Sequence, residues 1–131
     1  MKATVIIEKA SDGFFSCYME DDHFDFGLIG HGETAEAAKA DLITAYESLV
    51  KMYAEEGKAL PWLQFEFKYD LQAFFDYFNI INVTQLAEKA GINASQLRQY
   101  KSGLSRASQK QYEKLRICIK EIGYELVSAQ L

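Results

Sequence analysis

Three copies of one short pattern divide the second half of the chain and limit what it can fold into. In each copy a Gln follows a Ser or Asn by three positions: Asn82 and Gln85, Asn93 and Gln96, and Ser108 and Gln111. A short polar side chain at the start of a helix accepts a hydrogen bond from the amide three residues on, and a Gln there can return one. The pattern therefore predicts an array of short helices that begin at these positions.

The first two of these helices are predicted to meet at a sharp corner. Gly91 stands where the chain must turn, and a positive φ angle is expected there. Ala87 is small where the two helices must approach closely. The inner faces of the corner are expected to come from Leu86, Ala90, Ile92, Leu97 and Tyr100.

Two further helices are expected to flank the corner. One is the aromatic segment "LQAFFDYF", which Asp70 can cap. The other runs over about 109–122, ends at Gly123 and buries Tyr112, Leu115, Ile119 and Ile122. The remaining "YELVSAQL" is expected to form a short strand or to dock as a tail. We therefore place an all-helical domain over residues 71–131.

The second helix of the corner has a polar outer face without acids. Its outward residues are Ala94, Ser95, Arg98, Gln99 and Lys101. Arg can bind the guanine edge and Gln the adenine edge with two hydrogen bonds each. Lys101, Ser105, Arg106 and Lys110 follow where phosphates would pass. The pattern is typical of a duplex DNA reader, although a tight helical corner can also be an ordinary polar surface.

Residues 1–70 are predicted to form a small domain with the element order β-β-β-α-β. "ATVIIE" and "FFSCYMED" are rich in β-branched and aromatic residues and flank a turn at Asp12–Gly13, so they predict a hairpin. "FGLIGHGET" fits a third strand, Thr34 can cap a long amphipathic helix, and Gly57 can end it. "QFEFKY" alternates as a strand does. The whole chain is therefore expected to be of the α+β class.

No catalytic or metal-binding pattern stands out in the first half. "GLIGHGET" lacks the Gly-Lys-Ser/Thr ending of a phosphate-binding loop. The acidic cluster of Glu20, Asp21, Asp22 and Asp25 lacks the spacing of a calcium loop. Cys17 and Cys118 lie 101 positions apart, and neither His23 nor His31 has a second histidine four residues away. We expect no enzyme activity, no cofactor and no bound metal.

The two halves of the chain carry opposite net charges. Residues 1–72 hold 6 Lys or Arg and 14 Asp or Glu, whereas residues 73–131 hold 8 and 5. A net charge of −8 followed by one of +3 suggests two modules with different partners. The N-terminal segment has no apolar run suited to a signal peptide or a membrane span, so a cytoplasmic protein without a membrane partner is expected.

The helical corner resembles the helix-turn-helix of the Xre/Cro repressor family. Its pattern is carried by Leu86, Ala87, Gly91, Ile92, Leu97 and Tyr100, followed by "KSG". The resemblance places the base-reading positions on Ala94, Ser95 and Gln99, with Asn93 and Arg98 beside them. Val83 departs from the Gln that often clamps a phosphate at the start of the first corner helix.

The two modules together resemble a HicB-type antitoxin. The resemblance is carried by "TVIIEKASDGFFSCYMED", by the strand "FEFKY", and by Gly30, Gly32, Thr34, Glu36 and Ala37 leading into the long helix. It implies a partial RNase H-like domain that masks a small basic mRNA-cleaving HicA-like toxin, and a second domain that represses the operon by binding operator DNA. The strand "FGLIGHG" departs from the usual Pro-Gly form.

Two other classes of function remain open from the sequence. The chain can be a stand-alone transcription regulator whose first module binds another protein or a ligand. It can also be a degenerate nuclease, although Glu8 and Glu66 are the only strand acids and do not make a convergent set. A homodimer or a higher even oligomer is expected, because one corner helix spans too few base pairs for useful specificity.

Overall fold

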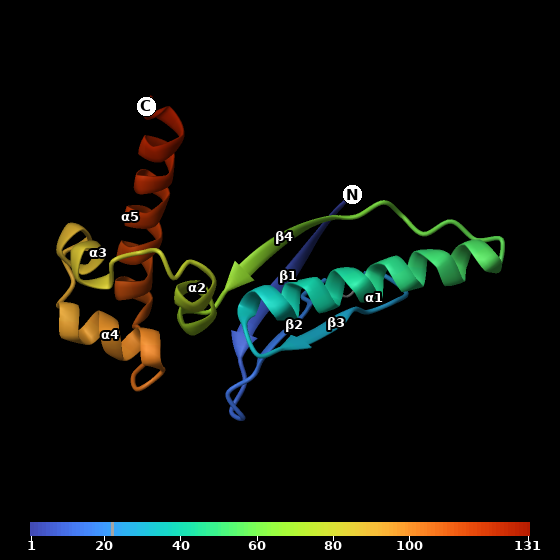
Figure 1. Ribbon diagram of the computed structural model, residues 1–131, viewed down its shortest axis with the longest axis horizontal. Helices are drawn as coiled ribbons and strands as arrows, with labels where there is room; N and C mark the ends of the chain where they lie inside the picture. Colours follow the sequence, from blue (N-terminus) through green and yellow to red (C-terminus); the bar gives the residue numbers. More distant parts are fainter. Residues whose placement is uncertain (22) are drawn as a thin grey trace. The chain divides into compact units, whose positions relative to one another are not determined.

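The computed structural model describes residues 1–21 and 23–131 and divides the chain into two compact units, Met1–Phe78 and Asn79–Leu131. A four-stranded mixed sheet with two helices makes up the described part of the first unit, and the second unit contains three helices (Figure 1). The chain is therefore a mixed protein of helices and strands, as its patterning predicts. Asp22, one member of the acidic cluster, lies outside the described residues.

The sheet has the strand order β3-β2-β1-β4. Its strands are β1 (Lys2–Lys9), β2 (Phe15–Met19), β3 (Ile29–Gly32) and β4 (Gln64–Tyr69). β1 runs antiparallel to β2 and parallel to β4, and β2 runs antiparallel to β3. The predicted hairpin is confirmed: Gly13 has a φ angle of 88° and the Phe14 amide donates to Asp12 at 3.0 Å.

Helix α1 (Ala35–Glu55) packs on one face of this sheet. Thr34 caps it as predicted, since its side chain accepts from the Ala37 amide at 3.0 Å. Gly57 follows the helix with a φ angle of 73°. The core of this unit combines Phe15 with small and branched residues: Val5, Ile7, Cys17, Leu28, Ala35, Ala38, Leu42 and Ala73. The small alanines allow the helix to lie close to the strands.

Helix α2 (Leu71–Tyr77) belongs to the first unit, although the sequence placed it in the second domain. Asp70 caps it as predicted. The Asp76 carboxylate accepts the Ala35 amide at 2.8 Å, and the ammonium group of Lys39 lies 4.0 Å from the ring centre of Tyr77. These contacts hold α2 against α1, so the division falls after Phe78 and not after Asp70.

The second unit consists of α3 (Val83–Ala90), α4 (Ala94–Ser102) and α5 (Gln109–Ser128). All three begin at the predicted caps. The predicted end of the last helix is wrong: α5 passes through Gly123 without a positive φ angle and continues to Ser128, so the segment after Gly123 is neither a strand nor a loose tail. Tyr112, expected in the core, is 38% exposed, whereas Leu115 is buried and Ile119 and Ile122 are half-buried.

None of the helices described in residues 1–21 and 23–131 has both the length and the apolar character that crossing a membrane requires.

Candidate functional site

The corner of α3 and α4 is built as the sequence predicts. Gly91 adopts the left-handed conformation with a φ angle of 72°, and the Ile92 amide donates back to the Ala87 carbonyl at 2.9 Å. Ala87 is fully buried, which lets the two helices approach. The corner and α5 share a small core of Leu86, Ala87, Ile92, Leu97, Tyr100, Leu115 and Cys118. This core fixes which face of α4 points to solvent.

Each helix of the second unit has its first free amides capped by a side chain. Asn82, Asn93 and Ser108 accept hydrogen bonds from Gln85, Gln96 and Gln111 at 3.0, 3.2 and 3.2 Å. In the described part of the chain, none of the Asn82, Asn93 and Ser108 amides donates a hydrogen bond to the Gln side chain three residues on. Gln96 donates to the Ser105 hydroxyl at 3.2 Å, and the Gln111 side-chain oxygen is buried without a hydrogen-bond partner. In each predicted capping box, the hydrogen bond that forms is therefore the one accepted by the Asn or Ser side chain at the start of the helix.

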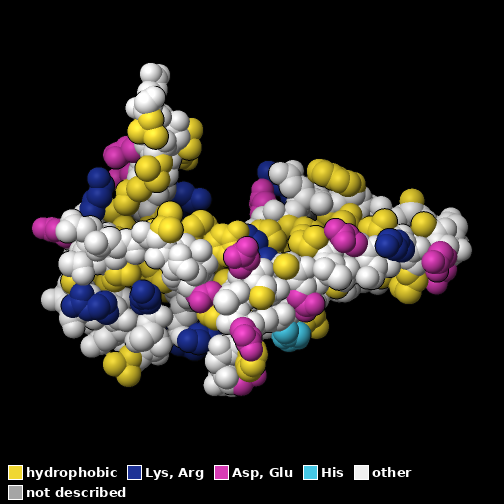
Figure 2. Space-filling model, in the orientation of Figure 1, with side chains coloured by type: hydrophobic (Ala, Val, Ile, Leu, Met, Phe, Trp, Pro, Cys, Tyr) yellow, Lys and Arg dark blue, Asp and Glu magenta, His cyan; other side chains and the backbone are white. Residues whose placement is uncertain are grey.

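The nine residues proposed from the sequence for DNA contact lie on α4, in the segments that flank it, or in the first turn of α5. Six of them are exposed: Asn93, Ser95, Arg98, Lys101, Arg106 and Lys110. The other three are half-buried: Ala94, Gln99 and Ser105. Figure 2 shows Lys and Arg side chains gathered over the α4 region, and α4 itself contains no acid. We call these nine residues, on α4 and on the segments beside it, the α4 surface.

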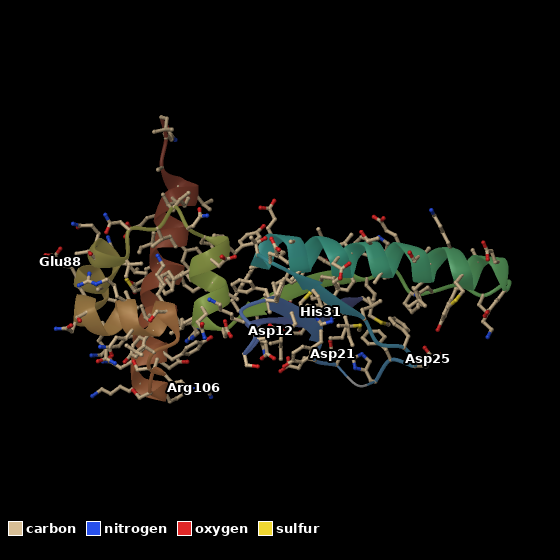
Figure 3. All side chains as sticks on the ribbon, turned by 60° about the horizontal axis from the view of Figure 1, so that its bottom comes forward. Asp12, Asp21, Asp25, His31, Glu88 and Arg106 are labelled. Carbon is tan, nitrogen blue, oxygen red and sulfur yellow. The ribbon has the colours of Figure 1, made fainter. Side chains whose placement is uncertain are left out.

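Three of these residues have side chains that are hydrogen-bonded within the unit, and one of them is Asn93, the cap of α4. The Ser105 hydroxyl accepts from Gln96, and its amide donates to the Gln99 carbonyl at 3.3 Å, so Ser105 fixes the loop after α4. Arg98 donates to the Thr84 hydroxyl of α3 at 3.2 Å. Thr84 was not singled out in the sequence, because only the folded corner brings it beside Arg98. Arg106 extends from the loop between α4 and α5 into solvent (Figure 3).

Net charge differs sharply between the two units. Residues 79–131 contain eight Lys or Arg and four Asp or Glu, a net charge of +4. Residues 1–78 contain six Lys or Arg and fifteen Asp or Glu, a net charge of −9. Because α2 and its Asp76 belong to the first unit, the two units differ in net charge by more than residues 1–72 and 73–131 do.

The acidic cluster of the first unit makes structural bonds. Asp21 accepts the Thr4 amide at 2.8 Å, and Glu20 forms an ion pair with Lys68 at 3.2 Å. Glu66 pairs with Lys2 at 3.1 Å. Within the part of the chain that the structure describes, no group of three His, Cys, Asp or Glu side chains comes together as a metal site would need.

A shallow hollow of about 330 Å³ lies beside the free edge of the sheet in the first unit. It is lined by Gly27, Leu28, Ile29, Ala45, Ser48, Leu49 and Met52. Ile29 and Met52 are 61% and 47% exposed, whereas Leu28 is buried and belongs to the core of the unit. Phe26 packs edge-on against Tyr53, with ring centres 6.4 Å apart. Asp41 accepts the His31 amide at 2.8 Å and covers part of the β3 edge.

Comparisons with protein-family models, with curated proteins and with solved structures found no match to this chain.

Proposed function

We propose that this protein is an antitoxin of the HicAB type, which binds operator DNA through the second unit and masks a small basic RNA-cleaving toxin with the first. The observation that carries the DNA-binding part is the α4 surface. It offers the exposed Ser95 and Arg98 and the half-buried Gln99 on one short helix without acids, next to Arg106 and Lys110. These side chains match what base edges and phosphates require.

The corner of α3 and α4 supports a helix-turn-helix assignment. Two capped helices joined through a left-handed glycine, with a buried alanine at their closest approach, are what such a motif needs. In this assignment α4 is the recognition helix that enters the major groove, and α3 lies across the backbone. One α4 helix reaches only a few base pairs, so we expect two copies on DNA, at half-sites separated by about 34 Å.

The charge of the first unit supports a second partner. A net charge of −9 opposes the approach of phosphates, so this unit is not expected to add to DNA binding. The same charge attracts a basic protein over long range and raises its association rate. The hollow at the sheet edge, with Ile29 and Met52 exposed, offers the apolar centre that a protein interface needs. The β-β-β-α-β order agrees with a partial RNase H-like domain that has lost its metal-binding acids.

DNA binding is tested with the full chain and a panel of duplexes that includes the DNA upstream of its own gene. The proposal expects one preferred sequence, with an affinity that falls steeply as salt rises because phosphate contacts release counterions. Equal and weak binding to every duplex would overturn the regulator function.

Masking is tested by mixing the full chain with a purified small basic protein encoded by an adjacent gene and measuring RNA cleavage. Loss of cleavage, together with a complex that survives moderate salt, supports the antitoxin. Sequence-specific DNA binding without such a complex would favour a stand-alone regulator, the second candidate, in which the first unit binds another protein or a ligand.

A further inference from the structure

The second half of α5 has no buried residue and packs little against the rest of the second unit. The buried residues of α5 are Leu115 and Cys118, both in its first half. Figure 1 shows the later turns rising beyond α3 and α4 of the same unit. Tyr124 and Val127 are 74% and 87% exposed. Helical turns gain most of their stability in proteins from packing of an apolar face, so these turns lack the partner that usually supports such a segment.

An apolar stripe runs along the solvent side of α5. Ile117, Tyr124 and Val127 are spaced at i, i+7 and i+10, which places them on one side of the helix. Ile117 is 50% exposed even though it lies within the half of α5 that contains the buried Leu115 and Cys118. The stripe therefore faces away from the core formed by Leu115 and Cys118, and Lys120 and Glu121 lie between its two apolar ends.

The charges of α5 run against its helix dipole. Residues 109–120 contain four Lys or Arg and one Glu, whereas residues 121–131 contain two Glu and no Lys or Arg. The first turn has no acid and the last turn has no base. Cations near the N-terminus and carboxylates near the C-terminus of a helix are both unfavourable for an isolated helix. The arrangement becomes favourable when a second helix with the same charges lies antiparallel beside it.

We propose that two copies of this chain associate through an antiparallel pair of α5 helices along the stripe of Ile117, Tyr124 and Val127. This inference rests on the self-association that is part of the proposed function, and it names the surface responsible. A two-fold axis near Lys120 and Glu121 sets Tyr124 of each copy against Ile117 of the other. The acidic end of each helix then lies beside the basic half of its partner, with Lys114 facing Glu125 across the pair.

Few contacts within the unit compete with this pairing. Glu125 lies 3.9 Å from Lys89, with both side chains largely exposed, and such a pair contributes little to stability. Arg116 pairs with Glu113 on its own helix at 2.9 Å, so it is a less suitable partner for a second copy than Lys114. A self-complementary surface is also the kind that closes as a dimer and does not grow into a filament.

The first test measures the mass of the full chain by light scattering and sedimentation, without DNA, across a micromolar concentration series. The double variant Tyr124→Ser/Val127→Ser should weaken self-association by roughly tenfold or more. Ile80→Ser is the matched control, because Ile80 is 91% exposed and lies outside α5. A monomeric wild-type protein, or a double variant that associates as the wild type does, would overturn the proposal.

The second test reverses charges and separates association from folding. Glu121→Lys/Glu125→Lys should weaken association. At dilutions where both proteins are monomers, the unfolding transition of the second unit should be unchanged or higher, since the new cations agree with the helix dipole. Adding Lys114→Glu/Lys120→Glu should restore association. If the variant with all four substitutions does not regain association, the antiparallel pairing is ruled out. Because no DNA is present, these results are independent of whether the α4 surface reads a sequence.

Discussion

The backbone of Gly30 in β3 lies so close to Leu42 of α1 that a Cβ atom added at Gly30 would stand 2.7 Å from the Leu42 amide nitrogen. The same added atom would be 2.9 Å from the Cys17 sulfur. Gly32 is equally restricted, with the Ala37 Cβ atom 2.6 Å from its added Cβ. The two glycines and the small residues of α1 thus let the helix and the β3 strand touch along their backbones.

Gly30→Ala should lower the free energy of unfolding of the first unit by about 1–3 kcal/mol, because backbone atoms cannot move aside as a flexible side chain can. Gly27→Ala is the matched control: an added Cβ at Gly27 meets nothing within 4 Å, so a change within about 0.5 kcal/mol is expected. Urea unfolding followed by circular dichroism measures both. Equal stability of the two variants would contradict the close packing of β3 on α1.

The Cys17 thiol should make the first unit less stable in alkali. Burial raises its pKa from the ordinary 9.0 to about 11, and the thiol donates to the Ala38 carbonyl at 3.1 Å. Between these values the folded protein holds a proton that the unfolded chain releases. The contribution is therefore complete below about pH 9 and is lost as pH rises towards 11, amounting to at most about 3 kcal/mol.

Urea unfolding at a series of pH values checks this dependence on the thiol. Cys17→Ala should show a flatter decline than the wild type between pH 9 and 11. Lys39 contributes a decline of the same sign in both proteins. Although partial burial opposes its charge, hydrogen bonding with the Tyr69 and Tyr77 hydroxyls keeps its pKa above the ordinary value. Identical slopes for the two proteins would show that Cys17 does not titrate as proposed.

Local chemistry allowed most of the elements to be predicted from the sequence. Asp12–Gly13 marked the hairpin, Thr34 and Asp70 marked helix starts, and Gly91 marked the corner, because each of these residues satisfies or permits a backbone arrangement within a few positions. The candidate DNA-contacting residues on α4 were likewise chosen from their spacing on one short helix. The exposure of Ser95, Arg98 and Lys101 follows from which face of α4 is apolar.

Features that depend on distant partners were not predictable in the same way. The aromatic helix α2 shows an apolar face, but the sequence does not say that this face meets Lys39 and β4 in the first unit. The sequence pattern also does not indicate that β1 pairs in parallel with β4. The sequence predicts that the Arg98 side chain points into solvent, whereas the fold brings Thr84 within hydrogen-bonding distance of it.

Gly123→Ala should stabilise the second unit, contrary to what the residue type suggests. The glycine looked like a helix end, yet α5 continues past it, and an added Cβ meets nothing within 4 Å. Alanine favours a helix interior over glycine by about 1 kcal/mol, so a rise of about that size in unfolding free energy is expected. Thermal unfolding measures it. A clear loss of stability would mean that residue 123 needs a positive φ angle and that the helix ends there.

The last prediction separates base contacts from phosphate contacts on the α4 surface. If Arg98 reads a base in the proposed complex, it must leave or share its hydrogen bond with Thr84, and Arg98→Ala should cost roughly 1–3 kcal/mol and relax preference at one position. Arg106→Ala should weaken binding to all sequences alike and lower the salt dependence by roughly one counterion. Binding curves over a panel of single-base operator variants, at several salt concentrations, measure both effects.

Arg116→Ala is the matched control for the loss of positive charge in the same unit. Arg116 is engaged with Glu113 on α5, at 2.9 Å, and lies off the α4 surface, so its removal should change binding far less than either other variant. Equal and sequence-independent losses from Arg98→Ala and Arg106→Ala would mean that both side chains contact phosphate. Equal losses from all three variants would mean that the net charge of the unit, and not the α4 surface, attracts DNA.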